Sequence, residues 1–345
     1  MLKLSVLSPY NIPNQISLFS EVFYYYLTKY CNVEVEVITE KNIYKSIDVQ
    51  SEGLGNVKVK VIDNWIRYKN IPIDRIVNEI KGEVIHVHFD ESMNLELIKE
   101  LKKMNKYVIL SIHKYDEELS KVCDSIDLIL CHNKLILDKV ETKNKLYLPY
   151  PVFKLPSFHK YFDVHFPERP IIGTITNELK FENYIDVAKV CSTYQNFYII
   201  GILKEYFTEI SLDLRDLQYE LYKILIDRYM IFVSDLAIDV LFTLTKLVDI
   251  NVIIDFDKTI YTPIILPISL AQYKLILTNN EIKFNELKDI SNELIVKDVK
   301  ELEKKILTFT QYKDEVLKII DKINEYNKRN SVYEVIQKYY DLIRS

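Results

Sequence analysis

Lys180 stands in a run of polar residues whose types and spacing suit the binding of a negatively charged group. The run comprises Thr174, Thr176 and Asn177, which follow an apolar stretch with Gly173 and precede a helical pattern. Backbone N–H groups and the dipole at a helix N-terminus attract anions, and a lysine adds a full positive charge. We therefore interpret Lys180 as the cation of a diphosphate site; the alternative is a solvated lysine on the first helical turn.

His113 directly follows the apolar stretch Tyr107–Ile112 and precedes the polar residues Lys114 and Asp116. A histidine at the end of a strand can orient a substrate hydroxyl or stabilise charge while a bond breaks. The alternative is a hydrogen-bonded histidine without a chemical role. We take His113 as a candidate catalytic residue.

His86 and His88 lie two positions apart in a strand-like stretch, so their side chains share one face, and Asp90 follows them. This spacing could supply half of a metal site. Catalytic zinc needs a third ligand, however, and His132, like the two remaining histidines, is isolated in the sequence. We therefore predict no metal and a structural or cleft-lining role, and a metal-dependent hydrolase is the least favoured function.

Tyrosine is abundant, with 26 residues, and two groups of tyrosines fall in helical patterns, Tyr24–Tyr26 and Tyr339–Tyr340. Aromatic residues at helical spacing are typical of a packed amphipathic face. We favour this interpretation over a platform on which nucleic-acid bases would stack.

The candidate residues follow short apolar runs that alternate with helical patterns along the whole chain. Leu2–Leu7, Val84–His88 and Tyr107–Ile112 are such runs in the first half, and Ile171–Ile175 and Phe197–Ile202 are in the second. Strand–helix alternation predicts parallel sheets covered by helices on both faces. The predicted fold class is α/β, with two Rossmann-like domains facing a central cleft at the carboxyl ends of their strands.

Prolines mark the boundary between the two halves, because five of the ten fall between residues 149 and 170. Proline fixes φ and lacks an N–H group, so such clustering is typical of a linker. We predict a first domain over 1–150, a linker over 151–167, a second domain over 168–330 and a separate helix over 331–345. The region from Val299 to about Asn330 is predicted to be one long amphipathic helix.

Length and composition exclude several classes of protein. At 345 residues the chain is long enough for about two domains, and its net charge of −5 argues against binding to duplex DNA by bulk electrostatics. With only five glycines there is no glycine-rich phosphate loop of a P-loop NTPase or a Rossmann dehydrogenase. Four scattered cysteines and no apolar run of about 18 residues predict a cytoplasmic protein without a membrane segment.

The order of several short motifs resembles the GT-B glycosyltransferases, in particular the large retaining family of nucleotide-sugar enzymes called group 1 (family 4-like). VIHVHFD at 84–90 is similar to that family's D-V-I-H-x-H strand, and VILSIHKYDEEL at 108–119 is similar to its strand ending in H-D. KLYLPYPV at 145–152 is similar to its i-P-n-P-V segment. RPIIGTITNELKFENYIDVAKV at 169–190 and PISLAQYKLILTNN at 267–280 resemble its nucleotide-binding half. The likeness keeps its order over most of the chain.

The resemblance implies a hexosyltransferase-type glycosyltransferase that moves a sugar from a nucleotide-sugar donor to a saccharide, lipid or protein acceptor. It implies retention of stereochemistry, no cofactor, no metal, and a C-terminal helix over 331–345 that crosses back to pack on the first domain. Lys180 would neutralise the departing diphosphate, and His113 would face the donor sugar. The other implied donor residues are Thr174, Thr176, Asn177 and Ser234. The implied acceptor residues are Asn11, Asn14, His88 and Asp90. No nucleic acid is expected as a partner, and a homo-oligomer is left open.

Two acidic positions of the resembled family are apolar here, since its paired glutamates align on Ile260 and Ile268. Isoleucine cannot accept a hydrogen bond from a donor ribose, so another group must hold it. We predict that the loop Asp255–Thr262 does so, with Asp257 as the ribose acceptor and with Tyr261 and Thr262 beside the donor. Thr262 before Pro263 is also the pattern of a helix N-cap. The alternative is a catalytically degenerate GT-B module that binds without turnover.

Overall fold

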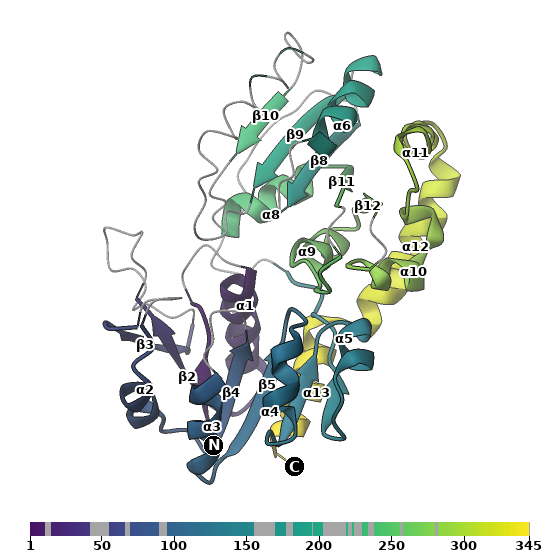
Figure 1. Cartoon of the computed structure of the whole chain (residues 1–345). Coiled ribbons are helices and arrows are strands. Elements are labelled where there is room, and N and C mark those ends of the chain that lie inside the picture. The colour runs from purple at the N-terminus through teal and green to yellow at the C-terminus, as the bar shows by residue number, and fades with distance from the viewer. Residues whose placement is uncertain are drawn as a thin grey trace. The chain divides into compact units, whose positions relative to one another are not determined.

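The computed structural model divides the chain into two compact units (Figure 1). The first unit comprises Met1–Pro151, Thr259–Thr262 and Asn330–Ser345, and the second comprises Val152–Lys258 and Pro263–Arg329. The structure describes residues 1–10, 15–41, 55–65, 70–89, 95–154, 170–176, 182–194, 196–202, 219, 223, 230–233, 238–255, 258–279 and 282–344. The predicted linker over 151–167 therefore lies mostly outside the described residues.

The first unit contains a parallel sheet in the order β3-β2-β1-β4-β5-β6-β7. Its strands are β1 Leu2–Leu7, β2 Val33–Glu40, β3 Lys58–Ile62, β4 Val84–Phe89, β5 Tyr107–Ile112, β6 Leu128–Cys131 and β7 Lys145–Tyr147. The central strands are buried on both faces because helices cover both, which is why they stand out as short, largely apolar runs in the sequence.

Helices cover each face of this first sheet. They are α1 Gln15–Tyr30, α2 Ile73–Glu79, α3 Leu95–Lys103, η2 Glu117–Leu119, α4 Ser120–Cys123, α5 Lys134–Lys139 and α13 Val332–Arg344. On one face Ile85 and Val87 of β4 share a hydrophobic core with Leu97 and Leu101 of α3. The alternate β4 residues point to the opposite face, where α1 lies and where α13 packs against α1 (Figure 1).

The second unit contains a parallel sheet in the order β10-β9-β8-β11-β12. Its strands are β8 Ile171–Thr176, β9 Phe197–Ile202, β10 Met230–Val233, β11 Ile250–Ile253 and β12 Leu275–Thr278. The helices are α6 Glu182–Thr193, α8 Ile238–Leu247, α9 Ile265–Ala271, α10 Asn285–Ile290, η3 Asn292–Leu294, α11 Val299–Gln311 and α12 Lys313–Arg329. Two parallel sheets with covering helices confirm the predicted α/β class with two Rossmann-like domains.

Two glycines permit close approaches that a side chain would block. A Cβ on Gly82 would lie 2.4 Å from the backbone nitrogen of Ser5, and the Gly82 N–H donates to Ser5 Oγ over 2.8 Å. In the second unit a Cβ on Gly173 would lie 2.4 Å from a Val248 methyl group. Both positions lie where a neighbouring segment presses on the backbone, so each sheet depends on one glycine for its packing.

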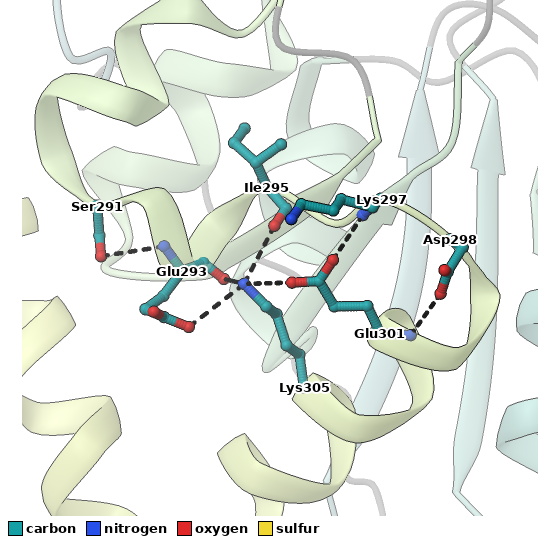
Figure 2. A network of polar contacts seen from close by, with 7 residues as sticks. All are labelled: Ser291, Glu293, Ile295, Lys297, Asp298, Glu301 and Lys305. Atoms are coloured by element: carbon teal, nitrogen blue, oxygen red, sulfur yellow. Dashed lines mark hydrogen bonds and ion pairs between the residues drawn. The ribbon is translucent and has the colours of Figure 1, made fainter.

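A lysine network fastens α11 to the edge of the second sheet (Figure 2). Lys305 Nζ donates to the backbone oxygens of Glu293 and Ile295 over 2.8 and 3.0 Å, and its charge faces the carboxylates of Glu293 and Glu301 at 3.3 and 3.5 Å. Asp298 caps the first turn of α11 by accepting from the Glu301 N–H over 2.8 Å. Ile295 also forms a parallel bridge with the last residue of β12. Lys305 therefore satisfies carbonyl groups that the sheet edge would otherwise leave open.

Several helix predictions are wrong in detail. The region after Val299 is two helices and not one, because Tyr312 separates α11 from α12. The N-cap of α9 is Ile264, so Thr262 does not cap that helix. The short helices α2 and α10 were not predicted, since seven or fewer residues carry too little periodicity to be recognised.

Candidate functional site

Of the candidate site residues, seven lie outside the described residues: Asn11, Asn14, Asp90, Asn177, Lys180, Ser234 and Asp257. Their roles stay predictions. The described candidates are His88, His113, Tyr261 and Thr262 in the first unit and Thr174 and Thr176 in the second.

The carboxyl ends of β4, β5 and β6 bring four histidines together on one face of the first sheet. His86 and His88 both lie on β4, where alternation places them on the side opposite to the hydrophobic core of α3. The register pairs His88 with Ser111 of β5, and His113 and His132 each follow the last residue of a strand. Because adjacent parallel strands end at one edge, residues far apart in the sequence become neighbours.

The imidazole rings form a continuous stack. Ring centroids lie 4.4 Å apart for His86 and His88, 5.0 Å for His88 and His113, and 4.7 Å for His113 and His132. Phe19 of α1 covers three of these rings at centroid distances of 5.1–5.5 Å. None of the four histidines is more than 1% exposed. His132, which is isolated in the sequence, is therefore a neighbour of the other three in space.

Every ring nitrogen in the stack has a hydrogen-bond partner. We refer to these rings and their side-chain partners as the histidine-tyrosine network, which comprises His86, His88, His113, His132, Ser111, Tyr24, Tyr150 and Tyr339. His132 lies 2.8 Å from the Leu148 carbonyl and 3.1 Å from the Ser111 hydroxyl, which lies 2.7 Å from His86. The Tyr24 hydroxyl lies 2.8 Å from His86 and 2.5 Å from His88. His113 lies 2.7 Å from His88 and 2.5 Å from the Tyr150 hydroxyl. Tyr339 of α13 adds a branch, 2.7 Å from His86 Nδ1.

Burial keeps the network electrically neutral. Loss of contact with water lowers the pKa of His86, His88 and His113 well below the ordinary histidine value, and each is lowered further by neighbouring histidines. Burial lowers the pKa of His132 to about 4, against the opposing effect of its bond to the Leu148 carbonyl. Burial likewise raises the pKa of the Tyr24 and Tyr339 hydroxyls. The network holds its protons as hydrogen-bond donors rather than as charges.

The network leaves the predicted histidines little freedom to act as metal ligands. Both nitrogens of His86 and of His88 are committed to tyrosine, serine or histidine partners. Within the described ranges, no group of three or more histidine, cysteine or acidic side chains is arranged to hold a metal ion. His113 is likewise bonded at both nitrogens and buried; its catalytic role stays a prediction.

Tyr261 and Thr262, which belong to the first unit, lie at the same edge of its sheet. Tyr261 forms an antiparallel bridge with Lys114, and the Ile260 carbonyl accepts from the Tyr115 N–H over 2.9 Å. Thr262 Oγ1 donates to the backbone oxygen of His132 over 3.1 Å and accepts from the Asn133 amide over 3.1 Å. The segment predicted to face the donor thus lies directly against the residues that carry His113 and His132.

Thr174 is part of the second sheet's interior. Its hydroxyl donates to the Val252 carbonyl over 2.9 Å and lies 2.8 Å from the Tyr198 hydroxyl. The Asn251 amide bridges to Ile175 from the neighbouring strand, accepting over 2.9 Å and donating over 3.3 Å. These side chains extend the pairing of β8 and β11 past the last backbone pair at Gly173. Thr176, also buried, ends β8 immediately before the undescribed Asn177.

A buried ion pair lies at the carboxyl ends of β11 and β12. Lys283 is fully buried and donates to the carboxylate of Asp255, whose backbone N–H donates to the Asn279 side chain over 2.7 Å. Lys283 could not be recognised from the sequence, because a single lysine in a polar segment carries no distinguishing pattern. Its partner Asp255 belongs to the loop predicted to hold the donor ribose, and it is the carboxylate of that loop that lies among the described residues.

Comparison of the whole chain with known proteins identifies similar structures only. No protein-family model matches the sequence, and no curated protein matches it significantly. Anabaena HepE, solved with UDP and glucose, superposes with a TM-score of 0.70 at 9% identity, covering 100% of both chains. A glycosyltransferase from Rickettsia africae superposes with a TM-score of 0.68 at 11% identity, covering 99% of this chain and 97% of the other.

S. aureus TarM gives the same result. In a mutant form solved with fondaparinux, alpha-GlcNAc-glycerol and UDP, it superposes with a TM-score of 0.70 at 10% identity over 100% of both chains. The chain has the GT-B fold. In this GT-B chain none of the described helices has the length and apolar character that crossing a membrane requires.

Proposed function

We propose that the chain is a glycosyltransferase that moves a sugar from a nucleotide-sugar donor to an acceptor. The supporting observation is that its GT-B fold matches, over the full length, structures solved with UDP, with UDP-glucose, and with UDP and glucose. An enzyme of this design stabilises the leaving diphosphate with cationic side chains and helix N-termini. The proposal includes a metal-independent reaction with retention of stereochemistry.

The direct test is a thermal-shift screen of the purified protein against UDP-, GDP- and ADP-sugars. A ligand present at about 100 times its Kd stabilises the folded state by about 2.7 kcal/mol, enough for a clear rise in Tm. The stabilising donor is then assayed for nucleotide release with panels of saccharide, lipid and peptide acceptors. Absence of a shift with every donor would contradict the proposal.

The finer parts of the proposal need their own measurements. Unchanged turnover after exhaustive treatment with EDTA supports metal independence, and loss of turnover that is restored by a divalent cation contradicts it. The anomeric configuration of the product, read by NMR immediately after transfer, distinguishes retention from inversion.

We predict that Lys180→Ala weakens donor binding at least tenfold and leaves Tm nearly unchanged. A hydrogen bond to a charged group contributes about 1.5–3 kcal/mol, which corresponds to roughly a tenfold to hundredfold change in Kd. Isothermal titration with the donor found in the screen measures the change. Lys189→Ala is the matched control, because Lys189 is exposed on α6 and pairs with Asp186 at 3.2 Å. Equal affinities of the two variants would make Lys180 a surface residue; Asp257→Ala tests the ribose contact in the same assay.

A catalytically degenerate GT-B module is the second candidate, and the two isoleucines favour it. Ile260 packs against the hydrophobic core of the first unit, and Ile268 is fully buried in α9. Neither position offers a carboxylate to a donor. Tight donor binding without turnover across the whole acceptor panel would support this candidate over the enzyme.

A further inference from the structure

Each neutral histidine and each hydroxyl of the histidine-tyrosine network has one hydrogen to donate. Because each contact uses one such hydrogen, the donor of a contact can be assigned by following the hydrogens along the network. At one end the Leu148 carbonyl can only accept, and His132 must therefore carry its proton on Nδ1. The bare Nε2 of His132 then accepts from the Ser111 hydroxyl, which in turn accepts from His86 Nε2–H. This half of the network has a single neutral arrangement, in which His86 Nδ1 is left bare as an acceptor.

The other half has two arrangements, because two tyrosine hydroxyls lie next to the bare nitrogen. Tyr24 and Tyr339 stand 2.8 and 2.7 Å from His86 Nδ1. If Tyr24 donates there, His88 donates to Tyr24 from Nε2, and His113 donates to His88 from Nε2. If Tyr339 donates there, Tyr24 is free to donate to His88, and both His88 and His113 carry their protons on Nδ1.

The surroundings of Tyr339 decide between the two arrangements. Tyr339 is fully buried, and among the described residues its hydroxyl has His86 Nδ1 as its one hydrogen-bond partner. If Tyr24 occupied that nitrogen, the Tyr339 hydrogen would be buried without an acceptor, which is costly. In the other arrangement the hydrogens of Tyr24 and Tyr339 are both bonded, while Tyr150 accepts from His113 and directs its own hydrogen away from that ring. The 2.5 Å contact from Tyr24 to His88 is also shorter than its 2.8 Å contact to His86.

We propose that Tyr339 of the C-terminal helix is a positioning residue that sets the tautomer of His88 and His113 through Tyr24. Its hydroxyl fills the acceptor on His86, turns the Tyr24 hydroxyl to His88, and so places the proton of His113 on Nδ1. His113 then donates to the oxygen of Tyr150, 2.5 Å away, and its Nε2 accepts from His88. A residue close to the end of the chain thereby determines which nitrogen of a strand-end histidine bears hydrogen. No part of this inference depends on the proposed function.

The test is NMR of the full-length protein labelled with ¹⁵N in its histidines, because the two ring nitrogens have different shifts when protonated and bare. In the unaltered protein His88, His113 and His132 are expected as Nδ1–H tautomers and His86 as Nε2–H. In Tyr339→Phe, His88 and His113 are expected to change to Nε2–H, while His86 and His132 stay as they were. If Tyr339 had only a packing role, replacing it with phenylalanine would not change which ring nitrogens are protonated.

Two further variants complete the test. Tyr333→Phe removes an exposed hydroxyl from the same helix and is expected to change no tautomer. Tyr24→Phe removes the hydroxyl that links His86 to His88. Adding Tyr339→Phe to the Tyr24→Phe variant should therefore cause no further change in the tautomers of His88 and His113. The inference is overturned if His113 of the unaltered protein is an Nε2–H tautomer, a result that needs no variant to fold, or if Tyr339→Phe leaves both rings unchanged.

Discussion

At the scale of single residues, the feature that most constrains the first unit is a group of buried imidazoles that must remain uncharged. His86, His88, His113 and His132 are enclosed by α1, α13 and the sheet, and no carboxylate among the described residues is hydrogen-bonded to them. A positive charge on any ring would turn an acceptor nitrogen into a second donor and leave it facing another hydrogen. Protonation and folding of this unit are therefore opposed.

We predict that the free energy of unfolding falls as the pH decreases from about 7 to 5. Unfolded histidines take up protons near pH 6.5, whereas the folded rings do not, with His132 titrating at about 4. The unfolded state thus binds more protons, and each histidine lowers stability by up to about 1.4 kcal/mol per pH unit. Urea unfolding at closely spaced pH values measures the slope.

The control for this pH dependence is His132→Asn, whose amide nitrogen can replace Nδ1 as the donor to the Leu148 carbonyl. In this variant the slope of the unfolding free energy against pH should be smaller by the contribution of about one proton between pH 6.5 and 5, and the contributions of the other histidines should remain. Stability that is independent of pH in this window would show that the rings are protonated in the folded protein.

At the scale of secondary-structure elements, the junction between β12 and α11 depends on a lysine as well as on the bridge between Ile295 and β12. Lys305 supplies hydrogen to two carbonyls, and the carboxylate of Glu301 both faces Lys305 and accepts from the Lys297 N–H over 2.8 Å. The short turn between η3 and α11 thereby keeps its backbone groups satisfied (Figure 2).

We predict that Lys305→Met destabilises the second unit by about 1–3 kcal/mol. Methionine keeps the apolar stem but leaves the Glu293 and Ile295 carbonyls without their donor, and buried groups that lose a charged partner cost about this much. Chemical denaturation measures the loss. Lys304→Met, at the exposed neighbouring position, should change stability by less than about 0.5 kcal/mol. Equal effects at the two positions would contradict the role of the network.

Elements buried on both faces were the most predictable from the sequence. Leu2–Leu7, Tyr107–Ile112 and Phe197–Ile202 have the predicted bounds, because apolar runs reflect burial directly. Short α2 and α10 lack that signal. The break at Tyr312 could not be seen because the apolar spacing continues across it.

The candidate site was less predictable than the elements around it. His113 and His88 were selected as strand-end residues, but their partners Tyr24 and Tyr339 were read only as packing. The positions of His113 and His132, each just after a strand, were a usable signal, since neighbouring parallel strands end together. No sequence pattern reveals that Tyr339, 253 positions from His86, is hydrogen-bonded to its Nδ1.

At the scale of the whole molecule, the first unit is assembled from three separate stretches of chain. Met1–Pro151 provides the sheet, Thr259–Thr262 contacts its carboxyl edge, and Asn330–Ser345 provides α13. The last stretch buries Val335, Ile336 and Tyr339 completely. The first unit therefore depends on residues that follow most of the second.

We predict that a chain ending at Asn330 fails to keep its first unit folded. Each fully buried aliphatic side chain of α13 contributes about 1.5–3 kcal/mol, and together they approach the roughly 5–15 kcal/mol that a domain has in total. Limited proteolysis with mass spectrometry should show early cleavage within Met1–Pro151 while second-unit peptides survive. A chain ending at Ile343 should resist like the full-length protein; equal resistance of the chain ending at Asn330 would contradict the prediction.

The late position of Tyr339 also bears on how the protein is made. A ribosome adds about 5–20 residues per second, so roughly 10–40 s pass between the synthesis of Tyr150 and that of Tyr339. During this interval the nascent sheet has its histidines but not the hydroxyl that completes them, and the face that α13 will cover stays open. Newly made chains would spend that time as a nascent species able to engage chaperones, and maturation of the first unit would wait for the synthesis of α13.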